Sequence, residues 1–245
     1  MLGALQGAEH TTLAAAHMEL AAGLSVDEQM VAVAAVRLLG ADVLAPYVLT
    51  GRTPPAEERA AIEVALAALP PAQPPPAAPP EGAEQAWVRA WIDWSLVTVL
   101  ARIDPSYMAP ATPEPPPPPR CDAGAARRQP PTTVPGDAAR EGWVPWSVRM
   151  GQLSSLALPG QDGPVHQAAR SGVLGLARGA TRAVLRRDFP TAARITRWLA
   201  WLHSERVELP LDPAPLTEHI ALLGAGGRVA LDTAISRRML GLEPV

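Results

Sequence analysis

The most regular hydrophobic pattern in the chain runs from Gly163 to Arg206. Between Val165 and Val184 the apolar residues fall within about 120° of a helix that turns 100° per residue. The sequence Asp-Phe-Pro-Thr at 188–191 interrupts this pattern, because proline lacks an amide hydrogen and keeps the preceding residue out of the helical conformation. We therefore expect one helix before the break and a second from Thr191, whose apolar face comprises Ile195, Trp198, Leu199 and Leu202.

Helical periodicity, with start and stop signals, predicts helices in most of the remaining chain. Ser25 and Glu28 form a capping-box pattern at the start of one helix, and Gly40 suits the position after its end. Thr53 is expected to cap another helix that begins with two prolines. The expected ranges are 9–22, 25–39, 53–69, 81–103, 147–158, 215–223 and 228–240. Alternation at the period of a strand is sparse, so the sequence predicts an all-α fold, either an irregular helical bundle or a loose α-solenoid.

Proline-rich segments divide the predicted helices. Residues 70–80 and 209–215 are short breaks, and residues 105–142 form a longer low-complexity segment with five consecutive prolines at 115–119. We interpret 105–142 as a disordered linker between an acidic N-terminal helical region, 1–104, and a basic C-terminal helical region, 143–245. The alternative is one helical domain from which the linker loops out. A proline tract is also a ligand for aromatic-lined grooves, which gives a second interpretation of 115–119.

All 21 positive charges of the chain are arginines, and lysine and asparagine are absent. This bias indicates a GC-rich, bacterial genome, so the choice of arginine over lysine carries little functional information. The net charge of −3 does not indicate a polyanion-binding protein as a whole. The charge is uneven, however, with five Arg and twelve acidic residues in 1–105 and eleven Arg and eight acidic residues in 161–245. The two halves could pack on one another, or the basic half could meet an acidic partner.

Arginines concentrate on the two basic helices between 166 and 202, where seven of them accompany a single acidic residue. Arg178, Arg182 and Arg186 step by four around the side opposite the apolar face. Arg197 and Trp201 are four residues apart, a spacing that allows a cation–π pair. The candidate surface for a polyanion or an acidic partner comprises Arg178, Arg182, Arg186, Arg194, Arg197 and Trp201. The alternative is a solvated helix face that only balances acidic helices elsewhere.

A stripe of three tryptophans gives a second candidate site. Trp87, Trp91 and Trp94 lie at positions i, i+4 and i+7 of the helix expected at 81–103. Such a stripe is typical of core packing against neighbouring helices. The same three rings would also suit the wall of a small-molecule pocket or of a groove for a partner.

The sequence offers no clear set of metal ligands or catalytic residues, and we predict neither a metal nor another cofactor. Cys121 is the single cysteine, and His10 and His17 are about 10.5 Å apart along a helix, too far for one zinc ion. The Gly-Ala-Gly-Gly sequence at 224–227 lacks the spacing of a phosphate-binding loop. No serine lies in a nucleophile-elbow context, and no carboxylate pair suggests acid–base chemistry, so whether the protein is an enzyme stays open.

The most apolar stretch, Met30–Leu49, contains Arg37 and Asp42, whose charges disfavour a simple transmembrane helix. The first ten residues have no basic region typical of a signal peptide, so the expected location is the cytoplasm. The predicted function is that of a non-catalytic helical interaction or adaptor protein in a bacterial cell, with an unidentified protein partner. The alternatives are nucleic-acid binding by the basic helices at 166–206, and a helical enzyme or small-molecule binder with a Trp-lined pocket. The oligomeric state is not predicted.

Overall fold

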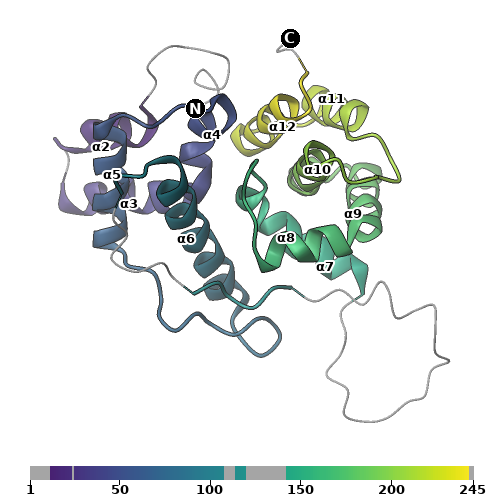
Figure 1. The fold of residues 1–245 in the computed structure, drawn as a ribbon, viewed down its shortest axis with the longest axis horizontal. Coiled ribbons are helices and arrows are strands. Elements are labelled where there is room, and N and C mark those ends of the chain that lie inside the picture. The colour runs from purple at the N-terminus through teal and green to yellow at the C-terminus, as the bar shows by residue number, and fades with distance from the viewer. Residues whose placement is uncertain (1–11, 24, 108–113, 120–141, 243–245) are drawn as a thin grey trace. The chain divides into compact units, whose positions relative to one another are not determined.

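The computed structural model describes residues 12–23, 25–107, 114–119 and 142–242. Within these residues the regular secondary structure is helical and no strand occurs, which confirms the predicted all-α fold (Figure 1). The chain forms two compact units, residues 1–117 and residues 118–245, so the division falls inside the Pro-rich segment. Cys121 and most of the expected linker lie outside the described residues.

The first unit, unit 1, contains α2 (Leu13–Ala21), α3 (Val26–Leu39), the 3-10 turn η1 (Gly40–Leu44), α4 (Ala45–Thr50), α5 (Ala56–Ala68) and α6 (Glu84–Ile103). The predicted capping box is present at the start of α3, because the Ser25 hydroxyl accepts a hydrogen bond from the Glu28 amide and the Glu28 carboxylate accepts one from the Ser25 amide. We expected Thr53 to cap α5, but it does not. The helix starts after Pro55, since the two prolines keep the residues before it extended.

A buried carboxylate from α5 caps the start of α2. Glu58 is fully buried, and its carboxylate oxygens accept hydrogen bonds of 2.9 to 3.0 Å from the backbone amides of Leu13, Ala14 and Ala15. The first amides of a helix have no partner within the helix, and they carry the positive end of its dipole. Glu58 satisfies three of them and thereby fixes α2 against α5, a role that the sequence did not reveal.

Helix α6 supplies much of the core of unit 1 and packs against α3 and η1. An ion pair crosses this contact, because Arg37 of α3 is fully buried and its Nη2 lies 2.7 Å from Oδ1 of Asp93 on α6. Burial raises the pKa of Asp93 and lowers the pKa of Arg37, and the attraction between the two charges opposes both shifts. The pair therefore ties α3 to α6 inside the unit.

One stretch, Val26–Thr50, is long and apolar enough to cross a membrane by length and composition alone. However, 61% of its most apolar window is buried inside the protein. Arg37 and Asp42, which interrupt the stretch, are both fully buried as well. A mostly buried helix of this composition is what a helical core contains, so the stretch is weak evidence for a membrane span.

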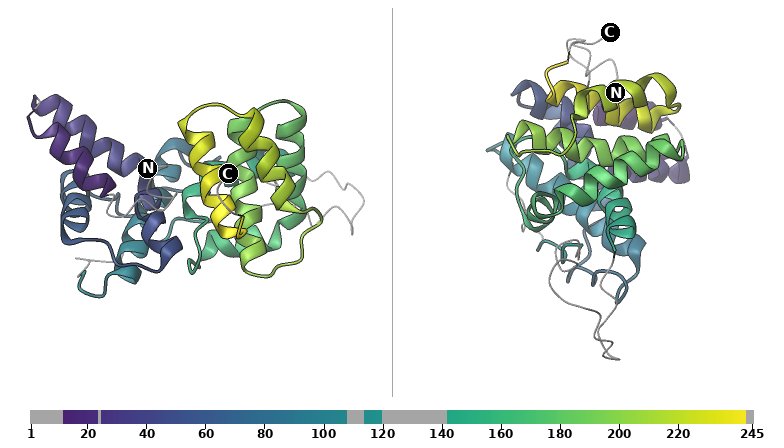
Figure 2. Two further views of the ribbon diagram at one scale, coloured as in Figure 1. Left: turned by 90° about the horizontal axis from the view of Figure 1, so that it is seen from above. Right: turned by 90° about the vertical axis from the view of Figure 1, so that its right-hand side faces the viewer.

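The second unit, unit 2, contains α7 (Trp143–Gln152), the 3-10 turn η3 (Ser154–Leu156), α8 (Pro164–Ser171), α9 (Val173–Leu185), α10 (Phe189–Ser204), α11 (Pro213–Leu223) and α12 (Gly227–Met239). Helix α10 is central, with α7, α9, α11 and α12 packed around it (Figures 1 and 2). Every residue from Ile195 to Leu202 is buried, so α10 buries all of its faces through these two turns. The helix expected from Thr191 begins slightly earlier, with Asp188 as its cap.

The first of the two basic helices is divided at Gly172 into α8 and α9, where the sequence predicted one continuous helix. A Cβ atom on Gly172 would lie 2.1 Å from the indole of Trp146, and one on Gly179 would lie 2.5 Å from Ser147. The missing side chains allow α7 to approach α9 closely. Trp146 is fully buried. The helix expected at 147–158 accordingly starts earlier, at Trp143, and ends at Gln152.

The proline tract makes fixed contacts with two buried tryptophans. In unit 1 the indole N–H of Trp87 donates to the carbonyl of Pro117 at 2.8 Å. In unit 2 the indole N–H of Trp146 donates to the carbonyl of Pro119 at 3.2 Å. Both contacts are made within the chain, so they do not test the interpretation of this tract as a ligand for a groove on another protein.

Candidate functional site

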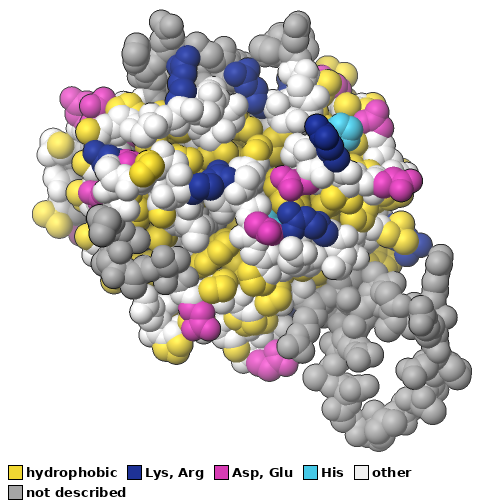
Figure 3. Space-filling model, viewed as in Figure 1, with side chains coloured by type: hydrophobic (Ala, Val, Ile, Leu, Met, Phe, Trp, Pro, Cys, Tyr) yellow, Lys and Arg dark blue, Asp and Glu magenta, His cyan; other side chains and the backbone are white. Residues whose placement is uncertain are grey.

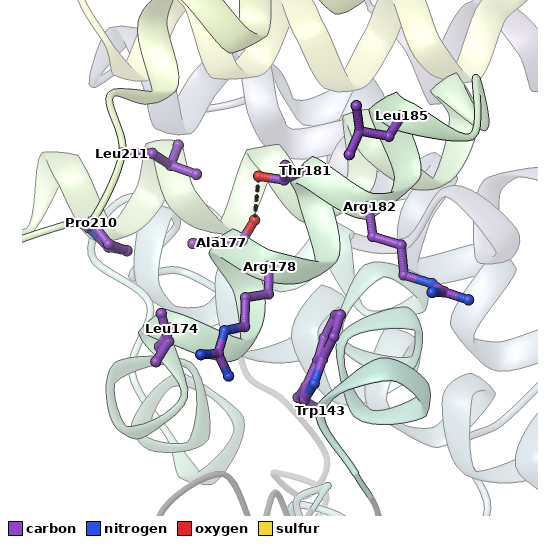
Figure 4. Close-up of a pocket in the computed structure, with 9 residues that line it drawn as sticks. All are labelled: Trp143, Leu174, Ala177, Arg178, Thr181, Arg182, Leu185, Pro210 and Leu211. Carbon is purple, nitrogen blue, oxygen red and sulfur yellow. Dashed lines mark hydrogen bonds between the residues drawn. The ribbon is translucent and has the colours of Figure 1, made fainter.

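An open groove on α9 is the candidate functional site of unit 2 (Figure 4). The volume of the groove is about 400 Å³. Its walls come from Trp143 at the start of α7 and from Pro210 and Leu211 in the segment between α10 and α11. Its floor is one face of α9, formed by Leu174, Ala177, Arg178, Thr181, Arg182 and Leu185.

The pattern of α9 explains why one helix supplies most of the lining. Successive lining residues between Leu174 and Leu185 are alternately three residues and one residue apart, a spacing that places them on one side of a helix. The other side carries Leu176, Ala180 and Ala183, which are buried in the unit. The amphipathic pattern of this helix thus directs most of the lining residues outward (Figure 4), whereas Ala177 is buried beneath them.

Large apolar side chains are exposed along the groove. Leu185 is 79% exposed and Leu174 is 46% exposed. The two leucines are about 16 Å apart along the helix axis. A single exposed leucine is ordinary, but here the two leucines share one groove with Trp143, Pro210 and Leu211. A partner that covered this surface would remove it from water, which stabilises a complex by about 1.5–3 kcal/mol for each large side chain that becomes fully buried.

Two guanidinium groups accompany the apolar surface. Arg178 and Arg182 are exposed on successive turns of α9, and within the described part of the chain neither forms an ion pair. Elsewhere in unit 2 arginines do have acidic partners, as Arg237 has in Glu218. Guanidinium groups bind carboxylates through paired hydrogen bonds. The groove therefore combines an apolar surface with positive charge that no described residue neutralises.

The structure separates the six residues that the sequence grouped into one basic surface. Arg178 and Arg182 line the groove together. Arg186 is exposed just past the end of α9, and Arg194 is half-buried on α10, next to Gly151. Trp143, which completes the groove, was not predicted, because it is distant from α9 in the sequence and reaches it only through the packing of α7.

Arg197 and Trp201 lie in the core and not on the surface where we expected them. Both side chains are fully buried. Nη1 of Arg197 lies 3.1 Å from Oδ1 of Asp232, and its Nε donates to the carbonyl of Ala157 at 3.2 Å. A buried guanidinium requires such partners, since an unpaired charge away from water is very costly. Helical spacing alone gave no sign of Asp232, which belongs to α12.

Asp232 is shared between two arginines and joins three elements of unit 2. Its Oδ1 lies near Arg197, and its two oxygens accept hydrogen bonds of 2.8 Å from Nη2 and Nε of Arg228. Arg228 also donates to the hydroxyl of Ser154 at 2.6 Å. The network connects α10, α12 and η3, so we assign it to structure and not to ligand binding.

Trp201 packs against a different cation from the one expected. The guanidinium carbon of Arg170, on α8, lies 4.9 Å from the centroid of the Trp201 ring, so the cation–π pair involves Arg170 and not Arg197. The rings of His166 and Trp198 lie 5.0 Å and 5.7 Å from the same ring. These contacts place Trp201 in an aromatic cluster of the core, where it is not available for stacking on a nucleic-acid base.

The second candidate site, the stripe of Trp87, Trp91 and Trp94, belongs to the core of unit 1. None of the three is more than 7% exposed. The rings of Trp91 and Trp94 meet edge to face with their centroids 5.4 Å apart. The stripe is therefore filled by packing, and these rings do not form the open wall of a pocket.

Within the described residues, no group of three or more His, Cys, Asp or Glu side chains is arranged to hold a metal ion. His17 is exposed on α2, and His10 lies outside the described residues. His166 is fully buried, and its Nε2–H donates to the carbonyl of Leu156 at 3.0 Å. The groove itself is lined by apolar side chains, Thr181 and two arginines.

Charged side chains are dispersed on the face of the molecule shown in Figure 3. Within each unit, the arginines visible on this face lie among apolar and acidic side chains.

Comparisons with known proteins found no family model, no curated protein and no solved structure that matches this chain. The candidate site is therefore defined by the residues of the α9 groove alone.

Proposed function

We propose that this protein is a non-catalytic interaction protein, and that the α9 groove of unit 2 binds a segment of a partner protein that carries leucine-like and acidic side chains. The observation that supports this proposal is the composition of the groove. Exposed leucines lie in one groove with Arg178 and Arg182, which have no ion-pair partner among the described residues. Apolar side chains of the partner would cover the leucines, and its carboxylates would pair with the two arginines.

The shape of the groove favours a helical segment as the ligand. The lining spans about three turns of α9, and an amphipathic helix that lies along such a groove presents residues at i, i+4 and i+7 to it. Acidic residues one turn apart on that helix would match Arg178 and Arg182, which are themselves one turn apart.

Nucleic-acid binding, the first alternative from the sequence, has less support from the groove. Leu174 and Leu185 would meet no complementary group on a phosphate backbone. Two arginines neutralise few phosphates, and phosphate contacts supply most of the affinity of sequence-independent binding. Trp201, the expected stacking residue, is fully buried.

Affinity purification of the tagged full chain from its own host tests the proposal. The groove variant L174S/L185S is compared with L222S/L223S, which removes two leucines exposed on α11 at 82% and 53%. The charge variant R178E/R182E is compared with R206E/R238E, which reverses two exposed arginines outside the groove lining. We expect a stoichiometric protein partner that both control variants retain and both groove variants lose.

Two results would contradict the proposal. One is a partner that the groove variants retain as well as the wild type does. The other is co-purifying nucleic acid that nuclease removes and that no protein replaces, which would favour the basic helices as a polyanion site.

A further inference from the structure

A second exposed apolar surface lies on unit 1, on the hairpin formed by α2 and α3, which pack side by side (Figure 2). Leu20 of α2 is 79% exposed, and on α3 Val26 is 76%, Val31 is 68% and Leu38 is 61% exposed. The α3 residues fall within about 140° of the helix, so they form one face. A helix that exposes such a face without a partner marks an interaction surface. We call this surface the hairpin face.

The hairpin face is acidic where the groove is basic. Glu19 and Asp27 are exposed beside its apolar residues, and within the described part of the chain neither forms an ion pair. Glu28 is also exposed, although its carboxylate is held by Ser25. The sequence of residues 1–105 is acidic as well, with twelve acidic residues and five arginines, although Asp42, Glu58, Asp93 and Asp104 among them are buried. The hairpin face thus has the composition that the proposed function requires of a ligand for the α9 groove.

The two surfaces also match in length. Helix α3 has 14 residues and α9 has 13 residues, so each is about 20 Å long. Val31 of the hairpin face is 68% exposed and Leu185 of the groove is 79% exposed, so neither surface is covered within its own unit. Contact between two identical surfaces is less favourable, because it would place Arg178 against arginine or Asp27 against acidic residues.

From these observations we infer that the hairpin face of one copy of this chain binds the α9 groove of a second copy. The inference rests on the proposed function of the groove and names its occupant. Because the two surfaces differ, the contact is head to tail, and it leaves one free groove and one free hairpin face at the ends of every open assembly. Such contacts extend into longer assemblies unless their geometry closes a ring.

The test measures the mass of the full chain by sedimentation velocity over a range of protein concentrations. The wild type should associate as its concentration rises, and higher salt should weaken this association, because exposed ion pairs are screened beyond about 8 Å at physiological ionic strength. The hairpin variant E19R/D27R and the variant R178E/R182E of the groove should each associate at least about tenfold more weakly than the wild type. The control E57R/E63R, which reverses two exposed acidic residues of α5, should behave as the wild type.

Mixing the two variants distinguishes a head-to-tail contact from a symmetric one. The hairpin variant keeps an intact groove and the groove variant keeps an intact hairpin face, so an equimolar mixture should form a one-to-one complex that neither variant forms alone. A symmetric contact would instead survive in one of the two variants. Circular dichroism spectra equal to that of the wild type would establish that both variants are folded.

Three outcomes overturn the inference. In the first, the wild type stays monomeric at every concentration while the groove still retains a different protein in the purification described above. The proposed function then stands without this occupant. In the second, both variants associate as the wild type does. In the third, neither self-association nor any partner is found, and the proposed function fails together with the inference.

Discussion

At the scale of single residues, several buried charges in this protein have partners that are distant in the sequence. Asp232 lies 35 residues from Arg197 in the sequence. Glu58 lies 44 residues from Ala14, whose backbone amide donates a hydrogen bond to its carboxylate. Burying a charge is tolerated only when nearby groups satisfy it. Removing one member of such a buried pair should therefore lower the stability of the protein more than removing an exposed charge does.

Replacing Asp232 by alanine should lower the free energy of unfolding by about 3–5 kcal/mol, because Arg197 would remain buried without its carboxylate. The double variant R197M/D232L should recover much of this loss, since it leaves no fully buried charge unpaired, and the side chain of Arg228, which also loses its carboxylate, is 29% exposed and reaches water. Urea unfolding of the three proteins measures both effects. A D232A protein as stable as the wild type would contradict the structural role of the pair.

Asp104 gives a prediction for the dependence of stability on pH. The Ser106 hydroxyl and the Arg59 guanidinium hold the pKa of Asp104 below its usual value. Because the folded pKa is lowered, this contribution to stability is present above the ordinary Asp pKa of about 3.9 and is lost as the pH falls through the folded value. The difference in stability between the wild type and D104N should therefore shrink between pH 6 and pH 3, as urea unfolding at each pH would show. A constant difference would contradict the assignment.

At the scale of helices, the sequence predicted what depends on near neighbours along the chain. The Ser25–Glu28 capping box and the break before α10 are local, and both are present in the structure. The division of the first basic helix at Gly172 was missed, because it depends on the Trp146 indole of another helix. Likewise, the spacing of Arg178 and Arg182 placed both on one exposed face, but Trp143 and Pro210 join them only after folding.

Gly172 provides the test of this packing. The G172A protein should lose about 1–3 kcal/mol of stability, because the added methyl group would overlap Trp146. G227A is the matched control, since a Cβ atom at Gly227 meets nothing within 4 Å at the start of α12. The control should be neutral or slightly stabilising, by less than about 1 kcal/mol, because alanine favours helix more than glycine does. Thermal unfolding measures the stability of both variants. A G172A protein as stable as the G227A protein would contradict the close packing of α7 on α9.

At the scale of the whole molecule, each unit exposes an apolar surface, the hairpin face in unit 1 and the α9 groove in unit 2, and the exposed charged residues on these two surfaces have opposite signs. The sequence already showed an acidic and a basic half, but charge counts do not tell which residues are exposed. Burial decides this, because Arg197 and Trp201 belong to the core while Arg178, Arg182 and Leu185 face solvent.

Site-specific photo-crosslinking in the host cell tests whether the α9 groove binds a segment of a partner protein. A photoreactive amino acid replaces Leu185 in the groove or, as the control, Leu222 on α11, two leucines of similar exposure at 79% and 82%. Position 185 should yield a crosslink to a protein segment rich in leucine-like and acidic residues, and position 222 should not. Equal crosslinking from both positions, or a crosslink from position 185 to nucleic acid alone, would contradict the assignment of the α9 groove as a protein-docking site.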